Sequence, residues 1–251
     1  MKDSQKNIIA WLTIALTPLS GLGIDIYTPA LPIMAHYFVI SGNLAKLSIS
    51  VYLFGYGFSQ LFWGPVSDKY GRKNILLLGI YGMTLCTTLI TLIPNFNVIL
   101  FVRLLHGISV GAIGASARAI LVDLFTGRVF AKYVNYTTIA WALSPIIAPV
   151  IGAYLTHHFH WQACFISLSI YGAIMIILSH LTLVRTNPES QPLHLKTITR
   201  SLKEVVTSKH FRACMLLMTF SYSTLAIFYV TGPFIIQVVM KHSPVFFGHV
   251  A

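Results

Sequence analysis

Gly64-Pro-Val-Ser-Asp-Lys-Tyr-Gly-Arg-Lys73 is a short charged segment that lies between two long apolar runs. Its ten residues include one acid, Asp68, and three bases. Only 9% of the chain is charged, so a cluster of this kind needs a physical reason. Gly64 and Gly71 let the backbone turn tightly and let a neighbouring helix approach. The segment therefore predicts a gate or a hinge between two membrane helices.

The composition of the chain sets its structural class. Hydrophobic residues make up 56% of the 251 residues, and the mean hydropathy is +0.76. Charged residues are far below the share of about 25% that is typical of soluble domains. A soluble fold must turn its exterior to water, so this composition excludes that class. Apolar runs of about 20 residues recur along the chain, which predicts an all-α integral membrane protein.

We predict seven membrane spans, with edges good to a few residues. Their limits are 8–35, 46–67, 75–93, 98–120, 133–156, 161–184 and 211–239. Pro18, Pro29 and Pro32 predict bends in the first span, because proline removes a helix hydrogen bond. That run is too long for a cleaved signal peptide and lacks a clean small-residue cleavage site.

The loops between the spans predict the orientation. Basic residues gather before the first span and after the second, fourth and sixth, whereas the alternate loops hold only Lys46 and Lys241. Positive charge marks the cytoplasmic side, so the amino terminus is predicted to be cytoplasmic. The net charge of +11 then reflects the orientation of the chain in the membrane. Nucleic acid is not an expected partner, because the bases are dispersed over membrane loops.

Three regions follow from this pattern. Residues 1–184 form a six-helix transmembrane bundle, residues 185–210 a cytoplasmic linker, and residues 211–251 a seventh helix with the start of a second bundle. Residues 197–209 could form a short amphipathic helix on the membrane surface. The apolar tail from Phe246 is typical of the start of an eighth span, which suggests a truncated chain. The alternative is a complete design of seven helices.

Two charges lie inside predicted spans, Asp25 in the first and Arg103 in the fourth. A buried carboxylate is costly unless it is paired, hydrated or protonated, so it is a functional candidate by default. At these depths the two side chains could pair across the bundle. Asp25 is then either a proton or substrate site, or half of a fixed ion pair that only joins two helices.

Other residues suggest a cavity and further charge pairs. Tyr52, Tyr56 and Gln60 recur at helical spacing and, with Tyr27, could line a cavity for aromatic or cationic molecules. Packing or lipid contact is the alternative for these side chains.

The charged residues at the predicted cytoplasmic ends of the spans could form ion pairs. Asp68 could pair with Arg72, and Asp123 could join Arg72 or Arg118. The alternative is that the turn is simply solvated, and that its bases reflect only the excess of positive charge in cytoplasmic loops.

The sequence gives no support for an enzyme or a cofactor site. The zinc-protease motif H-E-x-x-H and the phosphate-binding motif G-x-x-x-x-G-K-[ST] are absent, and we expect neither catalysis nor a cofactor. Cys86, Cys164 and Cys214 have no metal-ligand spacing and read as packing residues. His157, His158 and His160 could hold a metal, but a polar interfacial loop is the preferred interpretation, and no metal is predicted.

Several of these motifs resemble those of a known family. Residues 64–73, with Lys73 at the end of G-x-x-x-D-x-x-G-R-K, resemble the signature loop of major facilitator superfamily transporters. The D-x-Y-x-P core of residues 22–32 resembles the first helix of the Bcr/CflA branch of drug:proton antiporters. Residues 103–107 resemble the R-x-x-Q-G motif, with His106 where glutamine is usual.

Two further motifs agree with this branch. Residues 116–125 resemble its R-A-I-x-x-D-L-F ending of the fourth helix, which includes Arg118 and Asp123. Pro145, Pro149 and Gly152 resemble the proline and glycine motif of antiporters in the fifth helix. The resemblance covers almost the whole chain, but only a little more than the first half of the family's helices.

The resemblance implies a major facilitator fold, with a complete amino-terminal six-helix bundle and the first helix of the second half. It implies proton-coupled efflux of small drug-like molecules across the bacterial inner membrane by alternating access. Asp25 and Arg103 would couple protons to substrate, and the charged turn would act as the cytoplasmic gate. Pro145, Pro149 and Gly152 would form the antiporter hinge.

The expected partners are a small-molecule substrate, protons, the lipid bilayer, and a missing second half or partner chain. Three alternatives remain open for this chain. It is a non-functional or partner-dependent fragment, a superfamily importer of a sugar or metabolite, or a non-transporting scaffold or receptor-like module.

Overall fold

The computed structural model describes residues 3–183 and 206–251. Within those ranges the regular structure is entirely helical, as predicted. The predicted linker at 185–210 and the amphipathic helix at 197–209 lie largely outside the described residues.

The first predicted span is a row of short helices rather than one continuous helix. Its parts are α1 (Asp3–Leu16), α2 (Leu19–Asp25), the 3-10 turn η1 (Thr28–Ala30) and α3 (Leu31–Tyr37). Breaks fall beside Pro18 and Pro29, because proline supplies no N–H to the preceding turn. The prediction of bends in this span is confirmed.

The other predicted spans are long helices. They are α4 (Gly42–Tyr70), α5 (Arg72–Leu92), α6 (Phe96–Leu124), α7 (Gly127–His158), α8 (Gln162–Thr182) and α10 (Lys209–Phe234). A π-helical turn, η2 (Ile235–Val239), extends α10, and α11 (Pro244–Val250) follows in the tail. The ends differ from the predicted limits by a few residues.

By length and composition, six helical segments of the described chain can cross a membrane. They comprise the α1–α3 row, α5, α6, α7, α8 and α10 with η2. The predicted second span, α4, is not among the six, since glycine, serine, tyrosine and glutamine dilute its apolar run. Its 29 residues are nevertheless enough to reach across a bilayer.

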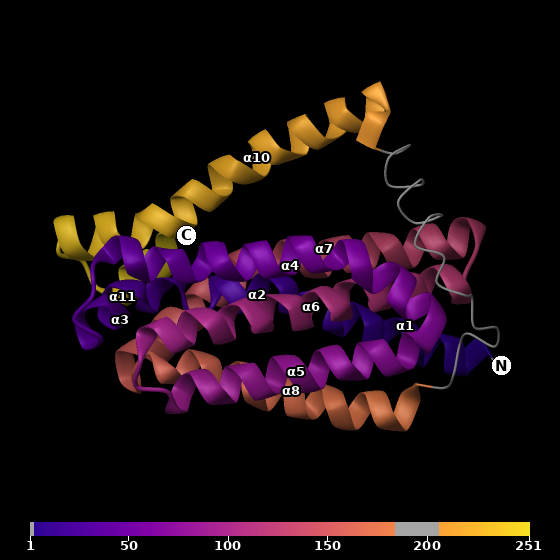
Figure 1. The fold of residues 1–251 in the computed structure, drawn as a ribbon, viewed down its shortest axis with the longest axis horizontal. Coiled ribbons are helices and arrows are strands. Elements are labelled where there is room, and N and C mark those ends of the chain that lie inside the picture. Colours follow the sequence, from indigo (N-terminus) through magenta and orange to yellow (C-terminus); the bar gives the residue numbers. More distant parts are fainter. Residues whose placement is uncertain (1–2, 184–205) are drawn as a thin grey trace.

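The long helices α4 to α8 run side by side in alternating directions (Figure 1). One end of the bundle carries the described amino terminus, the α4–α5 and α6–α7 turns, the end of α8 and the start of α10. We call it the basic end, because Lys69, Arg72, Lys73, Arg128, Lys132 and Lys209 lie on it. The α3–α4 and α5–α6 connections and α11 lie at the opposite end.

Small residues set how closely the helices pack. A Cβ added at Gly107 of α6 would overlap the Tyr52 carbonyl oxygen of α4. One added at Gly152 of α7 would overlap the Ile26 carbonyl oxygen, just beyond α2. The absence of a side chain at each position therefore permits backbone contact between helices.

Helix α10 contacts the bundle mainly near the opposite end. Tyr229 and Gly232 of α10 and Ile236 of η2 are buried there, whereas every residue from 206 to 224 is exposed. Figure 1 shows the orange part of α10 rising away from the bundle toward the basic end. Helix α11 packs on α7, where Gly248 meets Pro149 and Ala153.

Candidate functional site

The charged segment of residues 64–73 forms a tight turn between two helices. Helix α4 ends at Tyr70 and α5 begins at Arg72, so Gly71 alone joins them. Gly71 has φ +93°, a conformation that strains residues with a Cβ. This reversal places Asp68, Arg72 and Lys73 together at the basic end.

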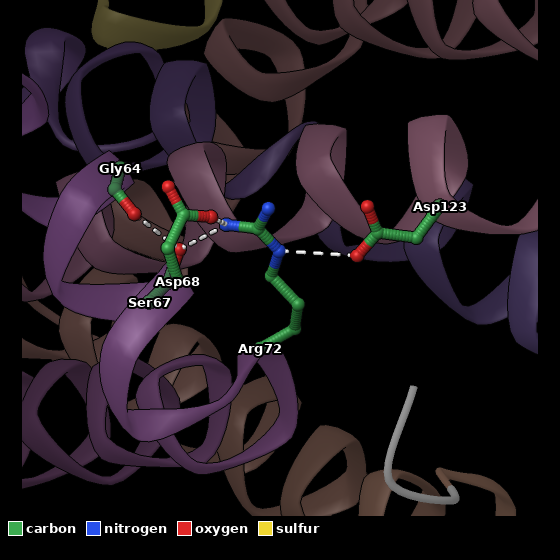
Figure 2. Close-up of polar contacts among 5 residues, drawn as sticks. All are labelled: Gly64, Ser67, Asp68, Arg72 and Asp123. Carbon is green, nitrogen blue, oxygen red and sulfur yellow. Dashed lines mark hydrogen bonds and ion pairs between the residues drawn. The ribbon is translucent and has the colours of Figure 1, made fainter. Parts of the chain in front are cut away.

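Arg72 holds three helices together at this turn (Figure 2). Its Nε donates to the Asp123 carboxylate of α6 over 3.1 Å, and a second guanidinium nitrogen pairs with Asp68 of α4. The same nitrogen donates to Ser67 Oγ over 2.7 Å, and that hydroxyl donates to the Gly64 carbonyl over 2.8 Å. The network thus links α4, α5 and α6 through a side chain that is only 14% exposed.

Arg72, and not Arg118, pairs with Asp123, which selects between the two partners that the sequence left open. Arg118 makes no hydrogen bond or ion pair to any residue in the described ranges, and it lines a cavity instead. The Lys73 ammonium donates to the Leu183 carbonyl at the end of α8.

A second polar centre surrounds Arg103, which is fully buried on α6. Its guanidinium donates to the Gly23 carbonyl over 2.9 Å, to the Tyr27 hydroxyl over 3.1 Å and to the Ser48 carbonyl over 3.4 Å. It also contacts His106 Nδ1 at 2.9 Å. A guanidinium only donates, so Nδ1 accepts and the imidazole is neutral, with its hydrogen on Nε2.

Aromatic rings complete the surroundings of Arg103. The guanidinium carbon lies 4.5 Å from the Tyr27 ring centre and 4.4 Å from that of Tyr52. Such cation–π contacts stabilise a buried cation. Tyr27 and Tyr52 therefore enclose Arg103, and neither lines the three cavities described below. Gln60, half-buried on α4, does not line them either.

The expected pair between Asp25 and Arg103 does not form within the described structure. Asp25 is 6% exposed, and its Oδ2 accepts from the Ser144 hydroxyl of α7 over 3.2 Å. Arg103 instead reaches the carbonyl of Gly23. Positions two apart on a helix are rotated by roughly 200°, so the Gly23 side of α2 meets α4 and α6 while Asp25 meets α7.

Three neighbouring cavities, which share lining residues, lie between the Asp25 region and the basic end. Asp25 lines a small one of about 30 Å³ with Pro145 and Tyr229. A second, of about 300 Å³, lies between α2, α4, α6, α7 and α10, and a third, of about 520 Å³, lies toward the basic end. Trp141 lines all three. Of the predicted cavity residues, Tyr56 lines the two larger ones.

The proline and glycine motif of α7 joins this helix to the first span and to α10. Gly152 packs on the Ile26 carbonyl, directly after Asp25. The Pro145 carbonyl accepts a hydrogen bond of 2.8 Å from the Tyr229 hydroxyl of α10. The motif therefore lies where α2, α7 and α10 meet, one residue beyond Ser144.

Among residues 3–183 and 206–251, no group of three His, Cys, Asp or Glu side chains is placed to hold a metal ion. His157 and His158 pack edge to face, with ring centres 5.0 Å apart. His158 also stacks on Tyr154.

Sequence reasoning missed three residues of this region. Ser144 holds Asp25, Tyr229 holds Pro145, and Trp141 lines every cavity described above. Spacing on α7 offered a partial signal, since Trp141, Ser144 and Pro145 lie at i, i+3 and i+4 and so share one face.

The buried charges, interrupted first span and cavities define a multi-pass helical membrane protein. The family model of the Major Facilitator Superfamily matches residues 14–250, and the chain belongs to that family. The bicyclomycin resistance protein homolog of Haemophilus influenzae is 29% identical over 92% of this chain and 59% of its own length. The uncharacterized MFS-type transporter YdgK of Bacillus subtilis is 31% identical over 97% and 62%, respectively.

Other relatives agree on the family. The multidrug resistance protein MdtL of Escherichia coli is 29% identical over 91% of this chain and 58% of its own length. The chain thus spans about 60% of the length of these curated relatives.

Solved structures share the fold. A bacterial homolog of the human lysosomal transporter Spinster, inward-facing and unoccupied, has a TM-score of 0.81 at 14% identity, over 100% of this chain and 59% of its own. A D-xylose-proton symporter has a TM-score of 0.75 at 12% identity, over 96% and 64%. The predicted fold class is therefore confirmed.

Proposed function

We propose that this chain provides the proton-coupling half of a transporter that exports small drug-like molecules in exchange for protons. Relatives with names that refer to bicyclomycin and multidrug resistance support export of drug-like substrates. The Asp25 carboxyl group would bind the proton, and the three neighbouring cavities would provide the path of the substrate.

The surroundings of Asp25 carry this proposal. The carboxyl group is buried in an apolar span, accepts one hydroxyl hydrogen bond and makes no ion pair to any described residue. An intramembrane acid without a cation partner is stable when it is protonated or hydrated, and it exchanges between these states as the site opens. Because a proton and a substrate donor compete for the same oxygens, binding of one favours release of the other.

Alternating access follows from the way α10 is attached. Near the opposite end, Tyr229 binds Pro145, and Gln237 donates to the Pro29 carbonyl over 2.9 Å. Toward the basic end α10 is exposed, and the largest of the three cavities described above lies there. This arrangement corresponds to a state closed at the opposite end and open at the basic end. The Arg72 network then acts as the gate element that changes partners when the basic end closes.

The direct test is Asp25→Asn in drug-sensitive bacteria that express the chain with the carboxyl-terminal half of a relative. The wild-type pair should lower cellular accumulation of a fluorescent drug when a proton gradient is present. Asp25→Asn should abolish this effect and leave membrane insertion intact. Asp3→Asn, at an exposed acid of α1, is the matched control. Unchanged export by Asp25→Asn contradicts the proposal.

We also propose that the basic end faces the cytoplasm of a bacterial cell and that the membrane is the inner one. The distribution of Lys and Arg supports this orientation. Single cysteines at Val129 and Val39, both exposed, should be labelled by an impermeant maleimide from opposite sides of the membrane. The native cysteines are first replaced by serine.

A second candidate is that the chain acts only together with another polypeptide. The exposed run of α10 from 209 to 224, which no described element covers, favours it. Export by the chain expressed alone would contradict it. The importer reading is tested in the same cells by the direction of flux, since it requires substrate uptake to rise with the proton gradient.

A further inference from the structure

Arg118 is the cationic group of the cavity wall. It lines both larger cavities, is exposed, and makes no hydrogen bond or ion pair with any residue of the described structure. Its five N–H groups are therefore available to a ligand. Arg72, in contrast, is committed to Asp68 and Asp123.

The hydroxyl groups around Arg118 have already donated their hydrogens. Each donates to a backbone carbonyl three or four positions earlier in the chain, at 2.7–3.2 Å. The residues are Thr13, Thr17, Ser20, Thr137 and Thr138. A hydroxyl group has one hydrogen and two lone pairs, so these side chains present only acceptors to the cavity. The donors left for a ligand are the Arg118 guanidinium, the Trp141 indole and the hydroxyls of Tyr56 and Tyr222, none of which makes a hydrogen bond to a described residue.

The two ends of the cavity series therefore differ in chemistry. Arg118 and Asp25 are the charged side chains that line the three cavities, and they line different ones. Between them lie aromatic surfaces of Tyr56, Trp141 and Tyr222, against which a planar apolar body can pack. A cation alone is repelled at the Arg118 end, and an anion alone is repelled at the Asp25 end.

We propose that Arg118 determines specificity, and that the site selects bipolar aromatic molecules with a hydrogen-bond donor or cationic group at one end and a carboxylate, sulfonyl or carbonyl group at the other. The acceptor group binds the Arg118 guanidinium, and the donor group binds the Asp25 carboxylate. This inference rests on the proposed function, because it names the substrate class of that same site.

The test uses three probes with one aromatic skeleton: 6-(aminomethyl)-2-naphthoate, 2-naphthoate and 2-naphthylmethylammonium. Binding to the purified chain in lipid nanodiscs is measured by calorimetry at mildly alkaline pH, with empty nanodiscs as the background. The bipolar probe should bind most tightly. Arg118→Gln should weaken the two carboxylate probes about tenfold or more, since hydrogen bonds to charged groups are strong, and should leave the ammonium probe unchanged or tighter.

Two further variants complete the design. Asp25→Asn should show the reverse pattern, with loss for the two ammonium probes and no loss for 2-naphthoate. Arg128→Gln removes an exposed cation of α7 that lines none of the three cavities, and it should change no affinity. Arg118→Lys should recover most of the carboxylate binding, which a purely structural role of Arg118 would not predict.

The outcomes separate this inference from the proposed function. Equal effects of Arg118→Gln on all three probes, or no effect on the carboxylates, overturn the specificity role even if export still depends on Asp25. Charge-selective loss with Arg118→Gln supports it even if Asp25→Asn exports normally, in which case only proton coupling fails. No binding of any probe to the wild-type chain contradicts the inference.

Discussion

The Tyr229 hydroxyl of α10 donates to the Pro145 carbonyl of α7 over 2.8 Å. In a regular helix, that carbonyl would receive the N–H of the residue four positions later. That residue is Pro149, which has no N–H, so its ring leaves the carbonyl of Pro145 without a donor. The proline spacing thus creates the acceptor that holds α10 to the bundle.

Tyr229→Phe should destabilise this attachment. The substitution keeps the ring but leaves a carbonyl unsatisfied in a largely buried place, at a cost of roughly 1–3 kcal/mol. The measurement is the free energy of unfolding in mixed detergent micelles. Tyr222→Phe is the control, since the hydroxyl of Tyr222 bonds to no described residue. Equal stability of the two variants would count against a structural role of the Tyr229 hydroxyl.

Arg72 and Asp123 should be energetically coupled. Their side chains are 14% and 28% exposed, so solvent weakens the attraction, and the expected coupling is about 0.5–1 kcal/mol. A double-mutant cycle with Arg72→Gln and Asp123→Asn measures it in the same unfolding assay. The same cycle with Arg118→Gln in place of Arg72→Gln should give additive effects, because Arg118 does not contact Asp123. Coupling to Arg118 of similar size would contradict the assignment.

Gly107→Ala should disrupt the contact between α4 and α6. The added methyl group overlaps the Tyr52 carbonyl oxygen, and such overpacking costs about 1–3 kcal/mol. Gly57 lies on α4, the other helix of this contact, and a Cβ added there meets no atom within 4 Å. Gly57→Ala is therefore expected to be neutral or slightly stabilising. The thermal midpoints of the two purified variants give the comparison, and a similar midpoint for both would show that the helices can separate freely.

His106 should be replaceable by glutamine and not by leucine. The imidazole accepts from Arg103 through Nδ1, whereas its buried Nε2 has no partner among the described residues. Glutamine retains an acceptor oxygen, but leucine leaves a buried guanidinium N–H unpaired, at a cost of roughly 1–3 kcal/mol. Unfolding curves of His106→Gln and His106→Leu test this. A leucine variant as stable as the glutamine variant would show that the Arg103 contact contributes little.

Local chemistry explains which features of the fold were predictable. Apolar runs, prolines and basic loops depend on residues close in sequence, so the spans and the breaks beside Pro18 and Pro29 could be predicted. The turn at Gly71 could be predicted equally well, because only glycine adopts its conformation without strain.

The partners of the buried charges could not be predicted in this way. Depth in the membrane suggested that Asp25 and Arg103 could meet, but depth does not specify rotation about the helix axis. Asp25 faces Ser144 on α7, whereas Arg103 lies between Tyr27 and Tyr52. Side-chain direction depends on how α2 rotates after the break at Pro18, which residue spacing alone does not determine.

The π-helical turn η2 begins directly after Pro233 and Phe234, at the attached end of α10. A wide turn beside a proline is a place where a helix bends. From Pro233 back to Lys209 the helix forms a rigid lever arm of roughly 36 Å at about 1.5 Å per residue. A rotation of about 10° of α10 about the π-helical turn would move Lys209 by about 6 Å. A small change in packing near Pro233 would therefore cause a larger displacement at the basic end.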